Sequence, residues 1–168
     1  MYNLINQNNL ISGENVMAIK DGNMAVEFML KDQTGNVVKL STFKGNKKVL
    51  LSFHPLAWTD VCARQMESLE MMFNDFTALN TVCLGISVDT APSKKAWAKS
   101  LNITKTSLPC DFWPHGEVAR NYGVFRERDG FSERANILMD EEQKIIFSKV
   151  YSLGDLPDLK EILEILKK

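Results

Sequence analysis

Residues 47–62, KKVLLSFHPLAWTDVC, decide the fold of this chain because they join a buried strand to a helix. The nearly continuous apolar run over residues 49–53 is typical of a strand that is covered on both faces. A proline stiffens the exit from this strand, and Thr59 or Asp60 is a suitable N-cap for a helix. This reading places Cys62 in the first helical turn.

The remaining pattern alternates strands with helices. Before the central strand, residues 28–40 predict a hairpin with a glycine-containing turn. After it, apolar residues at spacings of three and four extend the first helix to about Phe76. The further predictions are a buried strand over 82–88, a helix from Pro92 through Trp97, a short strand near Ser107-Leu108, a helix over about 115–122, strands over 135–139 and 144–150, and a final amphipathic helix capped by Asp155.

This order predicts an α/β fold with a mixed central sheet flanked by helices and an N-terminal hairpin extension. The right-handed strand–helix–strand crossover brings the carboxyl ends of the parallel strands to one side, where reactive groups usually lie. We expect a single domain over residues 1–168, with residues 1–16 as a poorly ordered extension.

Composition excludes several classes of function. Lys and Arg number 20 against 21 Asp and Glu, so there is no electrostatic reason to expect nucleic acid or an anionic membrane as partner. Hydrophobic residues make up 45% of the chain, yet none of its apolar runs is long enough to cross a bilayer. The first residues do not resemble a secretory signal, and a cytoplasmic protein is therefore expected.

The three cysteines are the candidate chemical groups. Cys62, Cys83 and Cys110 form neither a CxxC pair nor a metal-ligand pattern. In the first turn of a helix, Cys62 would face unsatisfied backbone N–H groups and the positive end of the helix dipole, which favour the thiolate. A small buried residue without reactivity is the alternative for Cys62, and position alone does not separate the two.

Residues 55–62 have the order Pro, three residues, Thr, two residues and Cys, and residues 111–116 are DFWPHG. The first pattern resembles the peroxidatic-cysteine motif of the peroxiredoxin family, which has Pro, three residues, Thr or Ser, two residues and Cys. The second segment makes the sequence most similar to the small bacterial one-cysteine subgroup that is similar to alkyl hydroperoxide reductase E. Further similar segments follow in family order, at residues 40–45, 85–89, 111–116, 122–124 and 133–140. The resemblance implies a thioredoxin-like fold and a thiol peroxidase that needs no metal or organic cofactor.

The resemblance also assigns roles to residues. It implies that Cys62 attacks a hydroperoxide and becomes a sulfenic acid. Thr59 would orient the peroxide, Arg134 would favour the thiolate and stabilise the leaving oxygen, and Pro55 would shield the sulfur. The backbone N–H groups of Val61 and Cys62 would bind the substrate. Taken singly, Thr59 also fits a plain helix cap, Pro55 a strand end, and Arg134 a surface ion pair.

Three residues depart from the family pattern. Gln65 stands where many peroxiredoxins have Glu, so the network around the arginine is expected to differ. Arg64 beside it either supplies compensating charge or faces solvent. His54 stands where an aromatic residue is common, and it either tunes the pH dependence or packs at the strand end.

The resolving step is left with two readings. No cysteine follows Cys110, and Glu67 occupies a resolving position used by another subgroup. Cys83 is expected in the core, whereas Cys110 is a candidate resolving thiol on the same side as Cys62. The preferred reading is a one-cysteine cycle, in which a thioredoxin-like protein or a low-molecular-weight thiol reduces the sulfenic acid.

The subgroup generally forms homodimers. Trp58, Trp113 or Phe43 would then contribute to the interface, unless these aromatic side chains pack in the core.

Three rival functions remain to be compared with peroxidase activity. A thioredoxin-type reductase needs a second thiol where Gln65 stands. A redox sensor or thiol-regulated binding module would use Cys62 without efficient turnover. A metal site from His54, Cys62 and His115 has no supporting spacing.

Overall fold

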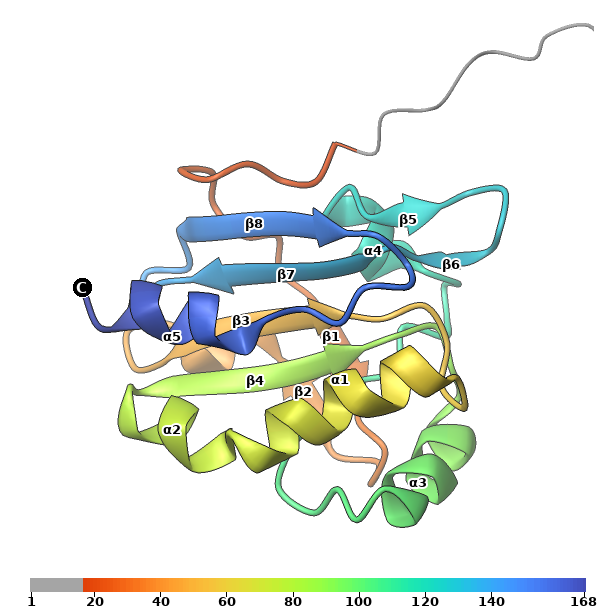
Figure 1. Ribbon diagram of the computed structural model, residues 1–168. Coiled ribbons are helices and arrows are strands. Elements are labelled where there is room, and N and C mark those ends of the chain that lie inside the picture. Colours follow the sequence, from red (N-terminus) through yellow and green to blue (C-terminus); the bar gives the residue numbers. More distant parts are fainter. Residues whose placement is uncertain (1–16) are drawn as a thin grey trace, which may run out of the picture.

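The computed structural model describes residues 17–168 (Figure 1). Its strands are β1 (Met29–Lys31), β2 (Val37–Lys39), β3 (Lys48–Phe53), β4 (Thr81–Ile86), β5 (Phe125–Arg126), β6 (Phe131–Ser132), β7 (Arg134–Met139) and β8 (Ile145–Tyr151). Its helices are α1 (Asp60–Met71), α2 (Phe73–Ala78), α3 (Ala91–Ser100), α4 (Glu117–Asn121) and α5 (Leu159–Leu166), with a 3-10 turn, η1, at Leu40–Phe43.

The central sheet has the strand order β4-β3-β7-β8. Strand β3 runs parallel to β4 and antiparallel to β7, and β7 runs antiparallel to β8. The sheet is therefore mixed, as predicted. Helices α1 and α2 supply the crossover that parallel pairing of β3 with β4 requires.

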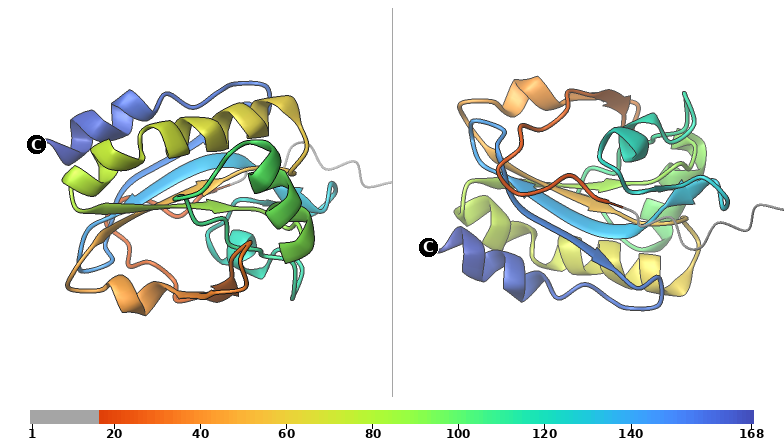
Figure 2. Two further views of the ribbon diagram at one scale, coloured as in Figure 1. Left: turned by 90° about the horizontal axis from the view of Figure 1, so that it is seen from below. Right: turned by 90° about the horizontal axis from the view of Figure 1, so that it is seen from above.

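Two layers cover the sheet (Figures 1 and 2). Helices α1, α2 and α5 lie on one face, and the β1–β2 hairpin, η1 and α4 lie on the other. Side chains alternate along a strand, so neighbours in β3 serve different cores. Leu50 packs with the α1 side and Leu51 with the hairpin side, and neither side chain is exposed.

The structure corrects several expected elements. The final helix is capped by Asp158, whose carboxylate accepts the N–H of Lys160, so the predicted cap at Asp155 is wrong. The predicted strand near Ser107 is replaced by isolated β-bridges. Ser107 pairs with Leu84 in β4, and Cys110 pairs with Ser87 just after β4. Both predictions rested on local composition alone. An Asp before an apolar run is a common N-cap and a short apolar segment is common in strands, but neither feature specifies the exact position or the pairing partner.

Other boundaries shifted by a few residues. The first helical segment is interrupted at Met72, which separates α1 from α2. The helix expected from residue 115 begins at Glu117, because Gly116 adopts a left-handed conformation with φ 71°. The short β5–β6 hairpin has no counterpart among the elements predicted from the sequence. The expected extension at residues 1–16 lies outside the described residues, and the single-domain assignment remains a prediction.

None of the helices within residues 17–168 is long and apolar enough to cross a membrane.

Candidate active site

The chain turns from β3 into α1 through residues 54–59. His54, Pro55 and Ala57 are buried in this turn, whereas Trp58 is 58% exposed and has a positive φ of 67°. The carboxylate of Asp89, just after β4, accepts the backbone N–H of Ala57 at 2.9 Å. The ends of the two parallel strands therefore fix the loop that precedes the helix.

Thr59 occupies the N-cap position of α1, as predicted, but its side chain does not cap the helix. Its hydroxyl donates instead to the carbonyl oxygen of Leu56 at 2.9 Å. Thr59 is exposed, so its hydroxyl oxygen has room for a further partner. The amide of Ala63 makes the first i→i−4 bond, to Thr59 O at 2.9 Å. The amides of Val61 and Cys62 therefore precede the hydrogen-bond ladder of the helix.

Cys62 and Arg134 come together across 72 positions of sequence. Cys62 is 1% exposed in the first turn of α1, and Arg134 is 2% exposed at the start of β7. The Nη2 atom of Arg134 lies 3.5 Å from the Cys62 sulfur. A buried guanidinium beside a thiol favours the negatively charged form of the sulfur.

The other hydrogen bonds of Arg134 go to neutral acceptors. Its Nε and Nη2 atoms donate to the carbonyl oxygen of Leu153 at 3.1 and 2.8 Å. Its Nη1 atom donates to Oε1 of Gln65. Among the described residues, Cys62 is thus the only hydrogen-bond partner of Arg134 that can carry a negative charge. The reading of Arg134 as a surface ion pair is wrong.

Gln65 is held by a buried chain of hydrogen bonds. Its Nε2 atom donates to the Ser52 hydroxyl at 2.8 Å and to the Phe53 carbonyl at 3.2 Å. The Ser52 hydroxyl donates in turn to Oδ1 of Asn136 at 2.8 Å. A carbonyl only accepts and a guanidinium only donates, so these partners fix the orientation of the Gln65 amide. Gln65 is therefore part of the arginine network, and the place of a second thioredoxin-type thiol holds a buried amide.

The surroundings of Arg64 and His54 decide between the two alternatives given for each residue. Arg64 points to solvent, where it pairs with Asp60 at 2.9 Å. His54 is fully buried against Trp97 with ring centroids 5.3 Å apart, and neither ring nitrogen has a hydrogen-bond partner within residues 17–168. Burial, and then the charges of Lys94 and Arg134, hold the pKa of His54 well below its usual range. His54 is thus a neutral packed ring at physiological pH.

The two other cysteines form no disulfide with Cys62. All three thiols are free. Burial raises the pKa of Cys83, which lies in β4 within the core, as expected. Burial also raises the pKa of Cys110, whose sulfur points toward the carbonyl oxygen of Leu108 at 3.6 Å.

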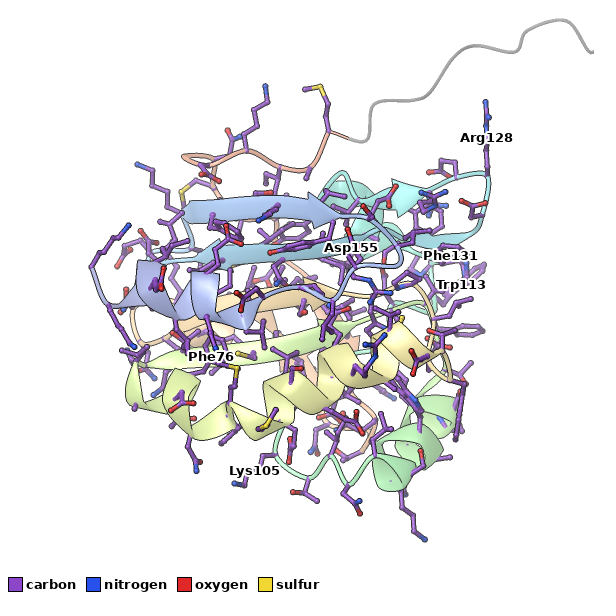
Figure 3. The ribbon with its side chains drawn as sticks, viewed as in Figure 1. Phe76, Lys105, Trp113, Arg128, Phe131 and Asp155 are labelled. Atoms are coloured by element: carbon purple, nitrogen blue, oxygen red, sulfur yellow. The ribbon has the colours of Figure 1, made fainter. Side chains whose placement is uncertain are left out.

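The expected interface aromatics divide into two groups. Trp58 and Trp113 are 58% and 79% exposed, whereas Phe43 packs against the core. Trp113 lies at the end of the molecule that also holds Phe131 (Figure 3). Core packing thus explains Phe43 but neither tryptophan.

A metal site is not formed from the predicted residues. His115 bonds through Nε2 to the carbonyl of Gly130 at 2.6 Å. No group of three or more His, Cys, Asp or Glu side chains suited to a metal occurs within residues 17–168.

Sequence reasoning missed two charged residues near the site. Asp89 belongs to a segment similar to the family, and its place shortly after a buried strand is the usual signal for a functional carboxylate. Lys94 was not singled out. Its signal was its spacing three before Trp97, on the apolar face of α3.

A buried cysteine at a helix start, beside a buried arginine on a mixed α/β sheet, defines the class of thiol-based redox enzymes. The AhpC/TSA family model matches residues 22–148. Alkyl hydroperoxide reductase E of Mycobacterium tuberculosis is 36% identical over 137 residues, which cover 82% of this chain and 89% of the relative. The thiol peroxidase of Staphylococcus saprophyticus is 33% identical over 150 residues and 87% of each chain.

Solved structures agree with this similarity. The reduced 2-Cys peroxiredoxin of Plasmodium vivax superposes with a TM-score of 0.81 at 29% identity, covering 88% of this chain and 80% of the other. The chain belongs to the AhpC/TSA family of peroxiredoxins and has their thioredoxin-like fold. It is an oxidoreductase that reduces peroxides at the expense of thiols, and the non-enzymatic sensor reading is not favoured.

Proposed function

We propose that Cys62 is the peroxidatic residue of this enzyme. The observation that carries this proposal is the 3.5 Å approach of the buried Arg134 guanidinium to the Cys62 sulfur. Neither Cys83 nor Cys110 has an arginine among its hydrogen-bond partners within residues 17–168. The start of α1 adds the amides of Val61 and Cys62, which precede the hydrogen-bond ladder of the helix.

The reaction follows from this arrangement. The Cys62 thiolate attacks the terminal oxygen of a hydroperoxide, and the O–O bond breaks. Both electrons of that bond leave with the other oxygen, the one that the sulfur does not attack. That oxygen takes up a proton and departs as water or an alcohol, while Cys62 becomes a sulfenic acid. Arg134 and the amides of Val61 and Cys62 stabilise the charge that moves onto the oxygens. Thr59 orients the peroxide through its exposed hydroxyl, and buried Pro55 shields the sulfur.

Regeneration is proposed to use an external thiol. A reductant thiolate attacks the sulfur of the Cys62 sulfenic acid, the S–O bond breaks, and the oxygen takes up a proton from solvent and leaves as water, which gives a mixed disulfide. A second reductant thiolate then attacks the reductant sulfur, forms the reductant disulfide and releases Cys62 as the thiolate. A thioredoxin-like protein or a low-molecular-weight thiol would serve. The direction of the Cys110 sulfur, toward Leu108 O, supports this one-cysteine cycle over an internal disulfide.

One equivalent of hydrogen peroxide added to the reduced protein tests both proposals. Tryptophan fluorescence followed by stopped flow gives the rate, and intact mass gives the product. A fast reaction that adds one oxygen and disappears only in Cys62→Ser is expected, with Cys83→Ser as the matched buried control. Loss of two hydrogens that Cys110→Ser abolishes would assign Cys110 as the resolving thiol. Reaction no faster than that of a free thiol would remove Cys62 from catalysis.

We further propose a homodimer in the cytoplasm. The exposed Trp58 and Trp113 support a contact between copies, and three free thiols suit a reducing compartment. Sedimentation should give twice the chain mass of 19.0 kDa, and Trp113→Ser should shift the protein toward monomer. A monomer in the unmodified protein would contradict the dimer, and recovery from a non-cytoplasmic fraction would contradict the location.

A further inference from the structure

Asp89 lies between β4 and α3, and its carboxylate binds the loop that leads to Cys62. Its Oδ2 atom accepts the backbone N–H of Ala57 at 2.9 Å and the hydroxyl of Ser87 at 2.7 Å. Ser87 is 1% exposed and forms a β-bridge with Cys110. A buried residue next to the sheet thus holds the carboxylate in place.

A single peptide group joins Asp89 to the hydroxyl of Thr59. The N–H of this group belongs to Ala57 and donates to Asp89. Its carbonyl oxygen belongs to Leu56 and accepts the Thr59 hydroxyl at 2.9 Å. Because a peptide group is planar, any rotation moves its N–H and its carbonyl oxygen together. Asp89 therefore fixes the acceptor toward which the Thr59 hydroxyl points.

The hydrogen bond to Leu56 decides how Thr59 meets a hydroperoxide. A hydroxyl has one proton to donate, and in Thr59 that proton is directed to the Leu56 oxygen. Toward any further partner the exposed Thr59 oxygen is therefore an acceptor, and a hydroperoxide has an O–H to donate to it. Rotation of the peptide between Leu56 and Ala57 would remove this arrangement and with it the alignment of the substrate.

The backbone of the loop requires such support. Trp58 has a φ of 67°, in the left-handed region that a bulky aromatic residue rarely adopts. A conformation of this kind persists only where the surroundings enforce it. The Trp58 indole N–H donates to the hydroxyl of Ser93 in α3 at 3.0 Å, so the loop is held at two adjacent residues, Ala57 and Trp58. The end of β4, helix α3 and the start of α1 lie at the same end of the sheet (Figure 1).

We propose that Asp89 is a positioning residue of the peroxidase site, which acts on the substrate through the Leu56–Ala57 peptide and the Thr59 hydroxyl. This inference rests on the proposed role of Cys62. Within residues 17–168 the Asp89 side chain hydrogen-bonds to the loop and to Ser87, and not to the sulfur or the arginine. Its role is that of a hydrogen-bond acceptor, so the amide oxygen of an asparagine at the same place should serve in its stead.

The test compares the second-order rate constants of the hydrogen peroxide reaction at pH 7. Asp89→Ala removes the acceptor and should lower the rate constant by about ten- to hundredfold, because the peroxide is no longer aligned with the sulfur. Asp89→Asn keeps an acceptor oxygen and should stay within about threefold of the unmodified protein. Asp75→Ala is the control for charge, because it removes an exposed carboxylate outside the site, and it should leave the rate constant unchanged.

Alkylation of Cys62 by iodoacetamide separates positioning from a change at the sulfur itself. This reaction needs the thiolate but no aligned peroxide. Loss of the Asp89 charge would by itself favour the thiolate and accelerate both reactions. We therefore expect Asp89→Ala to be alkylated at least as fast as the unmodified protein while its peroxide reaction is slow.

Three results would overturn the role of Asp89. The first is a peroxide rate constant in Asp89→Ala within about twofold of that of the unmodified protein. The second is an Asp89→Asn variant as slow as Asp89→Ala, since the charge and not the acceptor would then matter. The third is an equal slowing of peroxide reduction and alkylation, since the effect would then act through the sulfur.

Failure of the proposed function gives a different result. An unmodified protein that reacts with hydrogen peroxide no faster than a free thiol would overturn the role of Cys62, and the role of Asp89 with it. If Asp89→Ala does not fold, Ser87→Ala takes its place. This variant removes one of the two bonds to the carboxylate and should slow the peroxide reaction by about two- to fivefold, and an unchanged rate would overturn the role of Asp89.

Discussion

Gln65 is a neutral hydrogen-bond partner of Arg134, so it does not compete with the Cys62 sulfur for the positive charge of the guanidinium. Its amide oxygen accepts from the guanidinium, and its amide nitrogen is fixed by Ser52 and the Phe53 carbonyl. A carboxylate at this position would compete with the sulfur for the guanidinium. It would also place an oxygen against the Phe53 carbonyl oxygen, where Gln65 now donates a hydrogen bond.

We therefore expect Gln65→Glu to slow the alkylation of Cys62 at pH 7 by about three- to tenfold and to move the midpoint of its pH profile upward by about one unit. Peptide-resolved iodoacetamide labelling measures both quantities. Asn74→Asp, an exposed change of the same charge, should leave the profile unchanged. An identical profile in Gln65→Glu would mean that the neutral network does not control the arginine.

At the scale of elements, Glu70 joins α1 to the segment after α3. Its carboxylate accepts the backbone N–H groups of Thr104, Lys105 and Thr106, together with the hydroxyls of Thr104 and Thr106. Burial acts to raise the pKa of Glu70, but these hydrogen bonds outweigh it and lower the pKa to about 2. The carboxylate thus holds one end of α1 in place while Cys62 lies at the other.

Glu70→Gln should lower the free energy of unfolding at pH 7 by about 1–2 kcal/mol, because several charge-assisted hydrogen bonds weaken. The pKa of Glu70 is lower in the folded state than its ordinary value of 4.5, so its stabilisation is complete above that value and is lost as the pH falls toward 2. Urea unfolding at pH 7 and pH 3 should show the difference from the unmodified protein narrowing in acid. Glu67→Gln, exposed on the same helix, should show no such trend.

Gly85 allows α1 to lie close to β4. A Cβ atom at this position would lie 2.3 Å from the Met66 sulfur and 2.8 Å from Cδ2 of Leu108. Gly85→Ala should therefore destabilise the fold by about 1–3 kcal/mol, since α1 or the Leu108 segment must move. Thermal unfolding measures the loss. An unchanged melting temperature would indicate that the Met66 side chain simply turns away.

At the scale of the whole molecule, the sheet separates two cores that can be perturbed one at a time. Leu50→Ala and Leu51→Ala each remove a fully buried side chain and should each cost about 2–5 kcal/mol. Only Leu50 shares its cluster with Cys62. Alkylation of Cys62 should therefore accelerate in Leu50→Ala alone, and equal acceleration in both variants would show that the cores are coupled.

The sequence predicted the features that depend on local pattern. The buried run of β3, the start of α1 and the β7–β8 pair follow from periodicity and turn residues, and all three are confirmed. It did not predict contacts that depend on how strands are ordered. The contacts of Lys94 with the Gly85 and Pro109 carbonyls arise only when α3 packs beside β4; its spacing from Trp97 places it on the apolar face of α3 but does not indicate these partners.

Because Lys94 is buried, its chemical labelling measures how often α3 separates from the sheet. Lys95, its neighbour in the chain, is exposed and reacts with an acylating reagent in the folded state, whereas Lys94 has no surface for the reagent to reach. Both lysines fall within a single chymotryptic peptide, so the ratio of their labels is free of sampling error between peptides. That ratio reports the fraction of time for which α3 has separated from the sheet.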